Sequence, residues 1–374
     1  MPDFLVQTLA ILKGNVVPAL IVLTVVVFVH EMGHFLIARW CGIRVAAFSI
    51  GFGRELAGFT DRRGTRWKLS AIPLGGYVRF EGDENAASFP DPETLARTPP
   101  AERRGLFHFA PVWKRAAVVA AGPVANFILA ILVFAAVFTL LGRPHILPVA
   151  ETVISGSAAE RAGLRPGDRI LAVDGSEIDS FSELQSIVML SADDPLEVVV
   201  DRGGERVLLT ATPERQEKPD GLGGTHRTGV LGITAGEVDF RKDAPLPALR
   251  QGVSETYLII DRTLTFIGRL VRGRESAEQL SGPIGVGKVA GVVASSGGLP
   301  GLIYLTAVLS VSIGLFNLFP VPMLDGGHLV FYAIEALRGR PLSPRLQDLG
   351  FRVGFALVIM LFIFVTFNDI VNLS

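Results

Sequence analysis

Two histidines and a glutamate stand at the end of an apolar run near the start of the chain. In VVVFVHEMGHFLIARW, residues 25–40, Glu31 follows His30, and His34 lies four positions after His30. On a helix, positions i and i+4 share a face, so both imidazoles can bind one metal ion. Neutral imidazole is a good zinc ligand, and the adjacent carboxylate can take a proton from a water molecule that zinc polarises. The H-E-x-x-H pattern therefore predicts metal-dependent hydrolysis.

A catalytic zinc ion needs a third protein ligand and an open position for water. A second polar cluster inside an apolar run, NLFPVPMLDGGH at residues 317–328, offers Asp325 and His328, and chemistry alone leaves both as candidates. For His328 we favour a role outside the ligand set, such as anchoring a loop. Asn317 can pair with carbonyls that Pro320 and Pro322 free from a helix, or with substrate, and a packing amide is its alternative reading.

Composition indicates a membrane protein. The chain has 374 residues, 49% of them hydrophobic and only 19% charged, with a formal net charge of −1. Such a charge argues against a nucleic-acid partner, which selects a basic surface. The single cysteine, Cys41, excludes an internal disulfide framework and a cysteine-rich metal knuckle.

Four apolar stretches predict four transmembrane helices, since a helix needs roughly 20 apolar residues to cross the hydrocarbon core. They are residues 15–37, 116–141, 301–324 and 353–367, and the last depends on its flanks. Asn126 is the strongly polar side chain of the second stretch. The alternative, buried helices of a large soluble protein, fits four such stretches poorly. The first stretch lacks a cleavage site of small residues, so we expect it to be retained rather than removed as a signal peptide.

The distribution of basic residues predicts the orientation in the membrane. Lys and Arg are frequent between the first two stretches, and the short loop between the last two carries Arg338, Arg340 and Arg345. Because positive loops stay in the cytoplasm, both termini and residues 143–300 are expected outside. The second motif then reaches the same side of the membrane as the first. His145 and His226 fall on the outer side, far from the first motif, whereas His108 lies in the cytoplasmic loop.

Residues 48–82 alternate apolar and polar side chains between glycine turns, which predicts β-hairpins. The segment IPLGGYV within them is apolar enough to dip into the membrane if its backbone groups are paired. A small soluble sheet is the equally weighted alternative. Residues 84–105 are predicted to be an exposed loop.

Residues 145–215 predict a soluble α+β module, with strand, short helix, strand, Asp-Gly turn, helix and a Gly-Gly hairpin in that order. Through GSAAERAGLRPGDRILAVDG it resembles a PDZ domain of the bacterial protease type. Such domains bind extended peptides at a sheet edge, and a spacer or steric filter is the alternative. Residues 216–300 combine a polar linker with a helical segment that could lie along the membrane surface.

The whole arrangement resembles the site-2 protease family of intramembrane metalloproteases, peptidase family M50, and most closely its bacterial regulator-of-sigma-E protease branch. The shared segments, in the family's order, are HEMGH, FSIGFG, PLGGYV, AGPVANF, the PDZ segment and NLFPVPMLDGGH. The resemblance implies one Zn²⁺ held by His30, His34 and Asp325, with Glu31 as the general base. It implies that Asn317 binds substrate or stabilises the oxyanion, and that Gly75, Gly76 and Tyr77 line a substrate-binding edge. One PDZ pattern is present, whereas well-known members of this branch carry two.

The expected function is hydrolysis of peptide bonds within or near the span of single-span membrane proteins in the bacterial inner membrane. The family resemblance implies an anti-sigma factor as substrate, with remnant signal peptides as another class, and the PDZ domain can take a peptide ligand. Three rivals are a non-catalytic membrane adaptor that binds clients through its PDZ domain, a zinc hydrolase of lipids or small molecules, and a metal transporter. The expected segments are spans at 1–40, 115–142, 301–324 and 351–370, cytoplasmic parts at 41–114 and 325–350, the PDZ domain at 143–215 and the linker region at 216–300.

Overall fold

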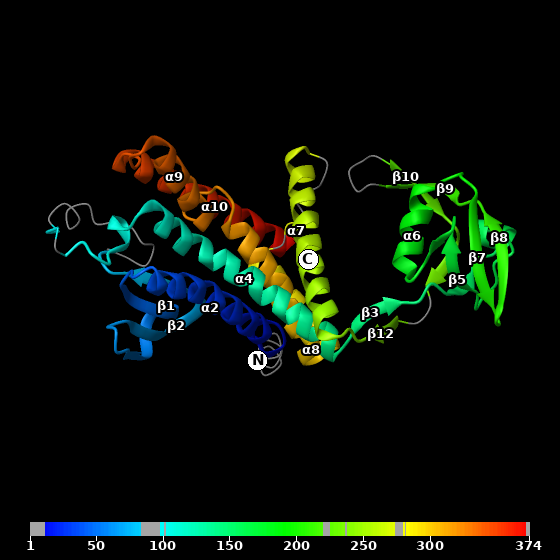
Figure 1. The fold of residues 1–374 in the computed structure, drawn as a ribbon, viewed down its shortest axis with the longest axis horizontal. Helices are drawn as coiled ribbons and strands as arrows, with labels where there is room; N and C mark the ends of the chain where they lie inside the picture. Colours follow the sequence, from blue (N-terminus) through cyan, green and yellow to red (C-terminus); the bar gives the residue numbers. More distant parts are fainter. Residues whose placement is uncertain are drawn as a thin grey trace. The chain divides into compact units, whose positions relative to one another are not determined.

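The computed structural model describes residues 12–83, 98–100, 102–219, 225–235, 238–273, 280 and 282–371 (Figure 1). The chain divides into two compact units. Unit 1 comprises Met1–Val137, Pro245–Thr265 and Glu278–Ser374, and unit 2 comprises Phe138–Ala244 and Phe266–Ala277. Most of the predicted loop at 84–105 and part of the linker at 216–230 lie outside the described residues.

Within the described residues, four helical segments are long and apolar enough to cross a membrane, which confirms the expected number. They contain α2 (Val17–Trp40), which follows the π-helical turn η1 (Leu12–Val16), α4 (Val112–Leu140), α8 (Pro283–Asn317) and α10 (Pro344–Val371). The protein is therefore built to sit in a bilayer.

Helix α8 differs from the stretch predicted for the third span, 301–324. It begins earlier, at Pro283, and bends at Gly298, whose φ is +55° and which lies just before Pro300. It ends at Asn317, because the following Pro320 and Pro322 have no N–H to donate to a helix. The chain after Asn317 is thereby free to turn before the next helix.

Small residues let the helices of unit 1 approach closely. A Cβ atom on Gly33 of α2 would lie 2.3 Å from the Ala121 carbonyl oxygen of α4. A Cβ atom on Gly314 of α8 would lie 3.2 Å from Asn126 Cβ of α4. Helices in lipid associate through such close packing, because apolar burial gives no driving force there. The interlocked helices α2, α4 and α8 form the frame of unit 1.

Strands β1 (Val45–Thr60) and β2 (Arg66–Phe80) follow α2 and pair antiparallel, which confirms the predicted hairpins. Phe48 of β1 pairs with both Trp67 and Val78, so residues 76–80 form one edge of the folded-over ribbon. The Phe48 ring is fully buried. Arg39 at the end of α2 donates to Asp61 and to Thr65 Oγ1, which fastens the ribbon to this helix.

The described residues of unit 1 contain all or part of three further helical elements outside the four spans. Residues 325–350, expected to be a loop, contain helix α9 (Asp325–Arg338), and η2 (Phe107–Phe109) precedes α4. Arg115 of α4 and Glu335 of α9 form an ion pair of 2.6 Å. Helix α7 (Pro245–Val271) begins in unit 1, where a Cβ atom on Gly252 would lie 2.7 Å from the Ile131 carbonyl oxygen of α4.

Unit 2 is an α+β module with its own core, in which Ile170, Leu184, Val198 and Val200 are buried. Its elements follow the predicted order, and its central sheet has the strand order β6-β5-β7-β8. The unit continues beyond residue 215 because β11 pairs with β4. Its elements are β3 (Arg143–Ile146), β4 (Ala150–Val153), α5 (Ala158–Arg161), β5 (Arg169–Val173), β6 (Ser176–Glu177), α6 (Phe181–Leu190), β7 (Leu196–Arg202), β8 (Glu205–Ala211), β9 (Glu214–Pro219), β10 (Thr225–Val230), β11 (Ile233–Ala235) and β12 (Val238–Arg241).

Candidate metal centre

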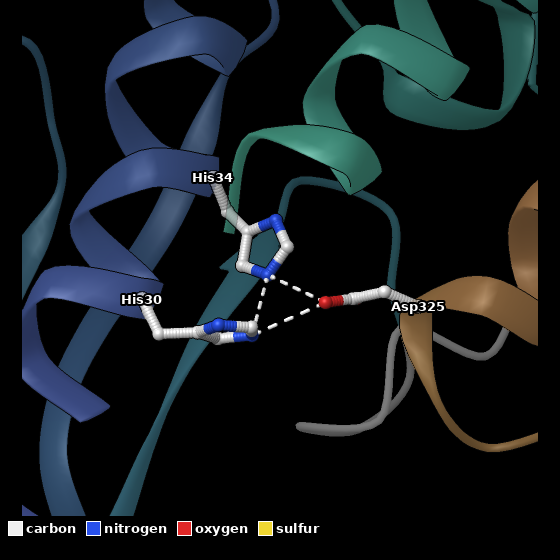
Figure 2. A group of neighbouring side chains, drawn as sticks. All are labelled: His30, His34 and Asp325. Carbon is white, nitrogen blue, oxygen red and sulfur yellow. Dashed lines mark hydrogen bonds and ion pairs between the residues drawn. The ribbon is translucent and has the colours of Figure 1, made fainter. Parts of the chain in front are cut away.

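Helix α2 presents both histidines of the first motif on one face. His30 and His34 are one turn apart, and their ring centroids lie 4.8 Å from each other. Both side chains are largely buried, and their Nε2 atoms are 3.2 Å apart. Figure 2 shows the two rings turned toward a common point.

Asp325 reaches the same point from the first residue of α9 (Figure 2). The turn that delivers it is tight, since a Cβ atom on Gly326 would lie 2.2 Å from the carbonyl oxygens of both Leu318 and Phe319. Met323, within this turn, has a φ of +97°, a strained conformation for a residue with a side chain. The prolines after α8 and the glycines of α9 thus fold the second motif back onto α2.

The three side chains have the separations that a tetrahedral zinc ion requires. Zinc bonds of about 2.0–2.1 Å at tetrahedral angles place ligand atoms about 3.3 Å apart. Asp325 Oδ2 lies 3.2 Å from His30 Nε2 and 3.5 Å from His34 Nε2. Oδ2 is buried and accepts no hydrogen bond from the described residues. An orphaned carboxylate oxygen beside two imidazole nitrogens fits a divalent cation.

Helix α4 forms the wall behind the two imidazoles. His34 Nδ1 lies 2.8 Å from the Val118 carbonyl oxygen, which can only accept, so Nδ1 carries the proton and Nε2 keeps a lone pair. A Cβ atom on Gly122 would lie 2.4 Å from His34 Nε2. The amide nitrogen Nδ2 of Asn126 lies 3.2 Å from His30 Nδ1. Sequence reasoning did not assign Val118, Gly122 or Asn126 to the site, although their spacing of four residues in AGPVAN and its flank was visible.

A cavity of about 220 Å³ opens onto the three convergent side chains and also contains Glu31. Residues 76–80 of β2, called here the β2 edge, form another wall of the cavity. A Cβ atom on Gly76 would lie 3.3 Å from Glu31 Cγ. The cavity is lined by His30, Glu31, His34, Gly76, Tyr77, Val78, Phe80, Phe107, Val118, Val119, Asn317, Met323, Asp325, His328 and Tyr332. A polar reaction centre and an extended strand edge therefore share one space.

The remaining predicted residues divide between the cavity and its surroundings. Asn317 lines the cavity, and its amino group donates to the Ile313 carbonyl at 3.0 Å. Gly75 is outside the lining and packs against Phe52 instead. His328 lines the cavity but is not one of the three convergent groups, and its ring packs 5.4 Å from that of Phe351.

The other described histidine on unit 1, His108, is also not part of the convergent group. Its Nε2 atom pairs with Asp83 Oδ1 at 2.7 Å. This contact accounts for its ring without a metal ion.

Known proteins match this chain along nearly its whole length. The model of peptidase family M50 matches residues 18–361. A protein of Agrobacterium fabrum, named "Putative zinc metalloprotease", is 51% identical over 366 residues, covering 97% of both proteins. A Brucella suis protein with the same description is 50% identical over 365 residues, covering 96% of both. Metalloprotease MmpA of Caulobacter vibrioides is 44% identical over 376 residues, covering 95% of this chain and 94% of the relative.

These matches include both polar motifs, the wall of α4 and the β2 edge, and members of the family depend on zinc. The chain belongs to peptidase family M50 and is a zinc metalloprotease of the site-2 type.

Proposed function

We propose that this metalloprotease hydrolyses peptide bonds within or near the membrane-spanning segment of single-span membrane proteins. His30, His34 and Asp325 hold the zinc ion, and Glu31 is the general base. The observation that carries this proposal is the convergence of the three ligand atoms in a cavity that also contains Glu31. The position of His30 and His34 within an apolar helix supports cleavage at membrane depth, since ionisable groups there mark function.

Each side chain has a separate task in this proposal. Zinc supplies a Lewis acid that polarises the scissile carbonyl and makes water more acidic. Glu31 takes the proton of the attacking water and passes it to the leaving amine. Asn317 donates to the substrate carbonyl as negative charge develops there, for which its amino group must turn away from Ile313.

The β2 edge receives the substrate backbone. A transmembrane helix hides its carbonyls in internal hydrogen bonds, so it must unwind before it can be cut. The unwound peptide then needs other partners for its amides in a medium with little water. Residues 76–78 border the cavity at the edge of the ribbon, and backbone pairing there would hold the peptide extended. Gly76 permits the close approach, and Tyr77 lines the same wall.

We infer the orientation in the bacterial inner membrane from the distribution of Lys and Arg among the loops. Cytoplasmic placement of residues 41–114 and 325–350 puts the metal centre near the cytoplasmic face and residues 143–300 outside. Outside, we assign residues 143–215 and the strands that complete their fold to a PDZ domain. A groove of about 250 Å³ between α6 and residues 229–233 supports this assignment.

The external module limits access by bulky substrates. A substrate whose outer domain has been removed by another protease passes, whereas an intact one does not. A membrane-bound anti-sigma factor is the substrate class that the family resemblance favours. The non-catalytic adaptor is disfavoured, because a binding module needs neither an orphaned Asp325 carboxylate nor Glu31 beside it.

The test of the chemistry is Glu31→Gln in the full-length protein. The variant should retain one zinc ion while cleavage of a single-span substrate falls by about 10²- to 10⁴-fold, because only the base is lost. Asp325→Ala should lose zinc, and His328→Ala should keep it. Cleavage by Glu31→Gln at the wild-type rate would remove Glu31 as the base. Full zinc content in Asp325→Ala would remove Asp325 as a ligand.

The access model has its own test. Two substrates share one transmembrane segment, and one of them retains its folded outer domain. We expect faster cleavage of the truncated substrate. Equal rates would contradict the access model and leave the assignment of the metal centre untouched.

A further inference from the structure

One face of α4 meets the two imidazoles at every fourth residue. Val118 contributes its carbonyl oxygen to His34, Gly122 leaves room for the rings, and Asn126 places its carboxamide beside His30. Asn126 has no exposed surface. A buried amide in an apolar helix is costly unless it is hydrogen-bonded. Its contact with His30 is the point at which it touches the metal centre.

The way His30 binds zinc determines which atom donates the hydrogen bond between His30 and Asn126. His30 Nε2 faces Asp325 Oδ2 and His34 Nε2, so Nε2 is the atom that can bind zinc. A neutral imidazole that binds a metal ion through Nε2 carries its proton on Nδ1. That proton needs an acceptor, and the polar group beside it is the Asn126 carboxamide, whose amide nitrogen Nδ2 lies 3.2 Å from Nδ1 in this structure. The amino group of Asn126 cannot serve, because it only donates.

We propose that Asn126 is a positioning residue for the metal centre, and that its carboxamide oxygen accepts the Nδ1 proton of His30. Oxygen and nitrogen of a carboxamide have nearly the same shape, so a half-turn of the amide exchanges them without changing the packing. Asn126 Oδ1 accepts no hydrogen bond from any residue that the structure describes, so the oxygen gives up no bond in that turn. The inference rests on the proposed role of His30 as a zinc ligand.

In both histidines, Nδ1 then donates a hydrogen bond to an oxygen of α4, which leaves Nε2 free to bind zinc. His34 is fixed by a main-chain carbonyl that substitution cannot remove, whereas His30 is fixed by a side chain that it can. Outer partners of this kind orient the ring and raise its basicity, and losing one typically weakens metal binding by about 10- to 100-fold. Asn126 is therefore the position at which the zinc affinity of this site can be changed without touching a ligand or Glu31.

The experiment measures zinc release to a chromogenic chelator from the full-length protein in detergent. Asn126→Leu keeps the size and removes the acceptor, and Asn126→Asp keeps an acceptor but removes the amide N–H. Ser310→Ala is the matched control, because Ser310 is buried and donates to the main-chain oxygen of Asn126 at 2.8 Å without contacting His30. The ligand-field spectrum of the cobalt-substituted protein gives a second readout of the ligand geometry.

We expect about 10- to 100-fold weaker zinc binding and an altered cobalt spectrum for Asn126→Leu. Asn126→Asp should bind zinc at least as tightly as wild type, and Ser310→Ala should match wild type. Wild-type affinity in Asn126→Leu would overturn the proposal. Loss of zinc in Asn126→Asp would also overturn it, since a donor would then be what His30 needs, and this variant decides the question if Asn126→Leu does not fold. Asp325→Ala, measured alongside, separates the cases: if it retains zinc, the ligand assignment itself has failed.

Discussion

Helix α4 packs directly against both imidazoles of the metal centre at Gly122. Helix α4 passes so near to α2 at this residue that a Cβ atom would lie 2.4 Å from His34 Nε2 and 2.8 Å from His30 Cε1. Real Cβ atoms do not approach other atoms so closely. The absence of a side chain at Gly122 is thus a condition for both imidazoles to face Asp325.

Gly122→Ala should therefore displace the imidazoles and reduce zinc content and proteolysis together. We expect at least a tenfold loss of zinc affinity, comparable to the loss of an outer partner. The measurement is metal content after dialysis against a weak chelator. Gly268→Ala in α7 is the control, because a Cβ atom there has no described neighbour within 4 Å and alanine is the better helix former. Equal zinc content in Gly122→Ala and Gly268→Ala would show that α4 yields more easily than this packing implies.

At the scale of elements, the start of α9 determines where Asp325 points. Gly326 lies against the carbonyl oxygens of Leu318 and Phe319, so the turn after α8 and the first turn of α9 are in direct backbone contact. The Arg115–Glu335 ion pair fixes the other end of α9 to α4. Asp325 is thus held by two contacts of its helix rather than by its own side chain.

Gly326→Ala should push α9 away from this turn and move Asp325 out of reach of the histidines. Backbone atoms stand in the way, so no side-chain rotation relieves the clash. We expect loss of bound zinc and of cleavage, with the helix content by circular dichroism unchanged. Gly287→Ala in α8, where a Cβ atom would meet none of the described atoms within 4 Å, should retain both properties. Wild-type zinc content in Gly326→Ala would mean that this contact does not position Asp325.

A carboxylate near the C-terminal end of α10 binds the N-terminal end of α8. Asp369, near the end of α10, accepts from the amides of Gly282, Ile284 and Gly285 at 2.9, 2.9 and 3.0 Å. These amides begin α8 and have no partner within their own helix. The negative charge also complements the positive end of the helix dipole. Asp369 is buried, so the contact is shielded from water.

Asp369→Ala should lower the free energy of unfolding of the protein in detergent by about 1–3 kcal/mol, because it leaves buried amides without an acceptor. The melting temperature followed by circular dichroism measures this change. Asp348→Asn is the control, since Asp348 is exposed and pairs with Arg352 on the same helix surface. A melting temperature for Asp369→Ala equal to that of the control would contradict a stabilising role.

At the scale of the whole molecule, unit 2 carries a pH-sensitive ion pair between the buried carboxylate of Asp168 and the partly exposed Arg202. The Arg202 guanidinium donates to both carboxylate oxygens of Asp168 at 2.8 and 2.7 Å. These bonds hold the pKa of Asp168 below its usual value, against the desolvation that raises it. Because the folded-state pKa is lowered, the pair stabilises unit 2 above the unfolded-chain pKa of about 3.9. The contribution disappears as the pH falls through the folded-state pKa.

Amide hydrogen exchange of the full-length protein tests this pair within unit 2. We expect protection of the buried Val198 and Val200 amides to be steady from pH 7 to about pH 5 and to fall below about pH 4. The protection must be corrected for the intrinsic pH dependence of exchange. Asp168→Asn should reduce protection at pH 7 and flatten the acid-side fall. An identical acid-side fall in Asp168→Asn would assign it to other groups.

The sequence by itself predicted the features that depend on neighbouring residues. The spacing of His30 and His34 placed them on one helical face, four apolar runs gave the number of spans, and alternation gave the hairpins. These features depend on residues close in the chain and on helix and strand periods. The resemblance to a known family added Asp325, which chemistry alone left as a rival of His328.

Only the tertiary structure decided what lies between distant segments. The hydrogen bond from His34 to Val118 joins residues 84 positions apart, and its acceptor is a main-chain oxygen that every residue possesses. The early end of α8, the helix α9 and the clearance at Gly122 depend on backbone contacts across segments. The types of side chain and the helix or strand period of the sequence do not predict such contacts. The contacts arise only when helices that are far apart in the sequence pack closely together.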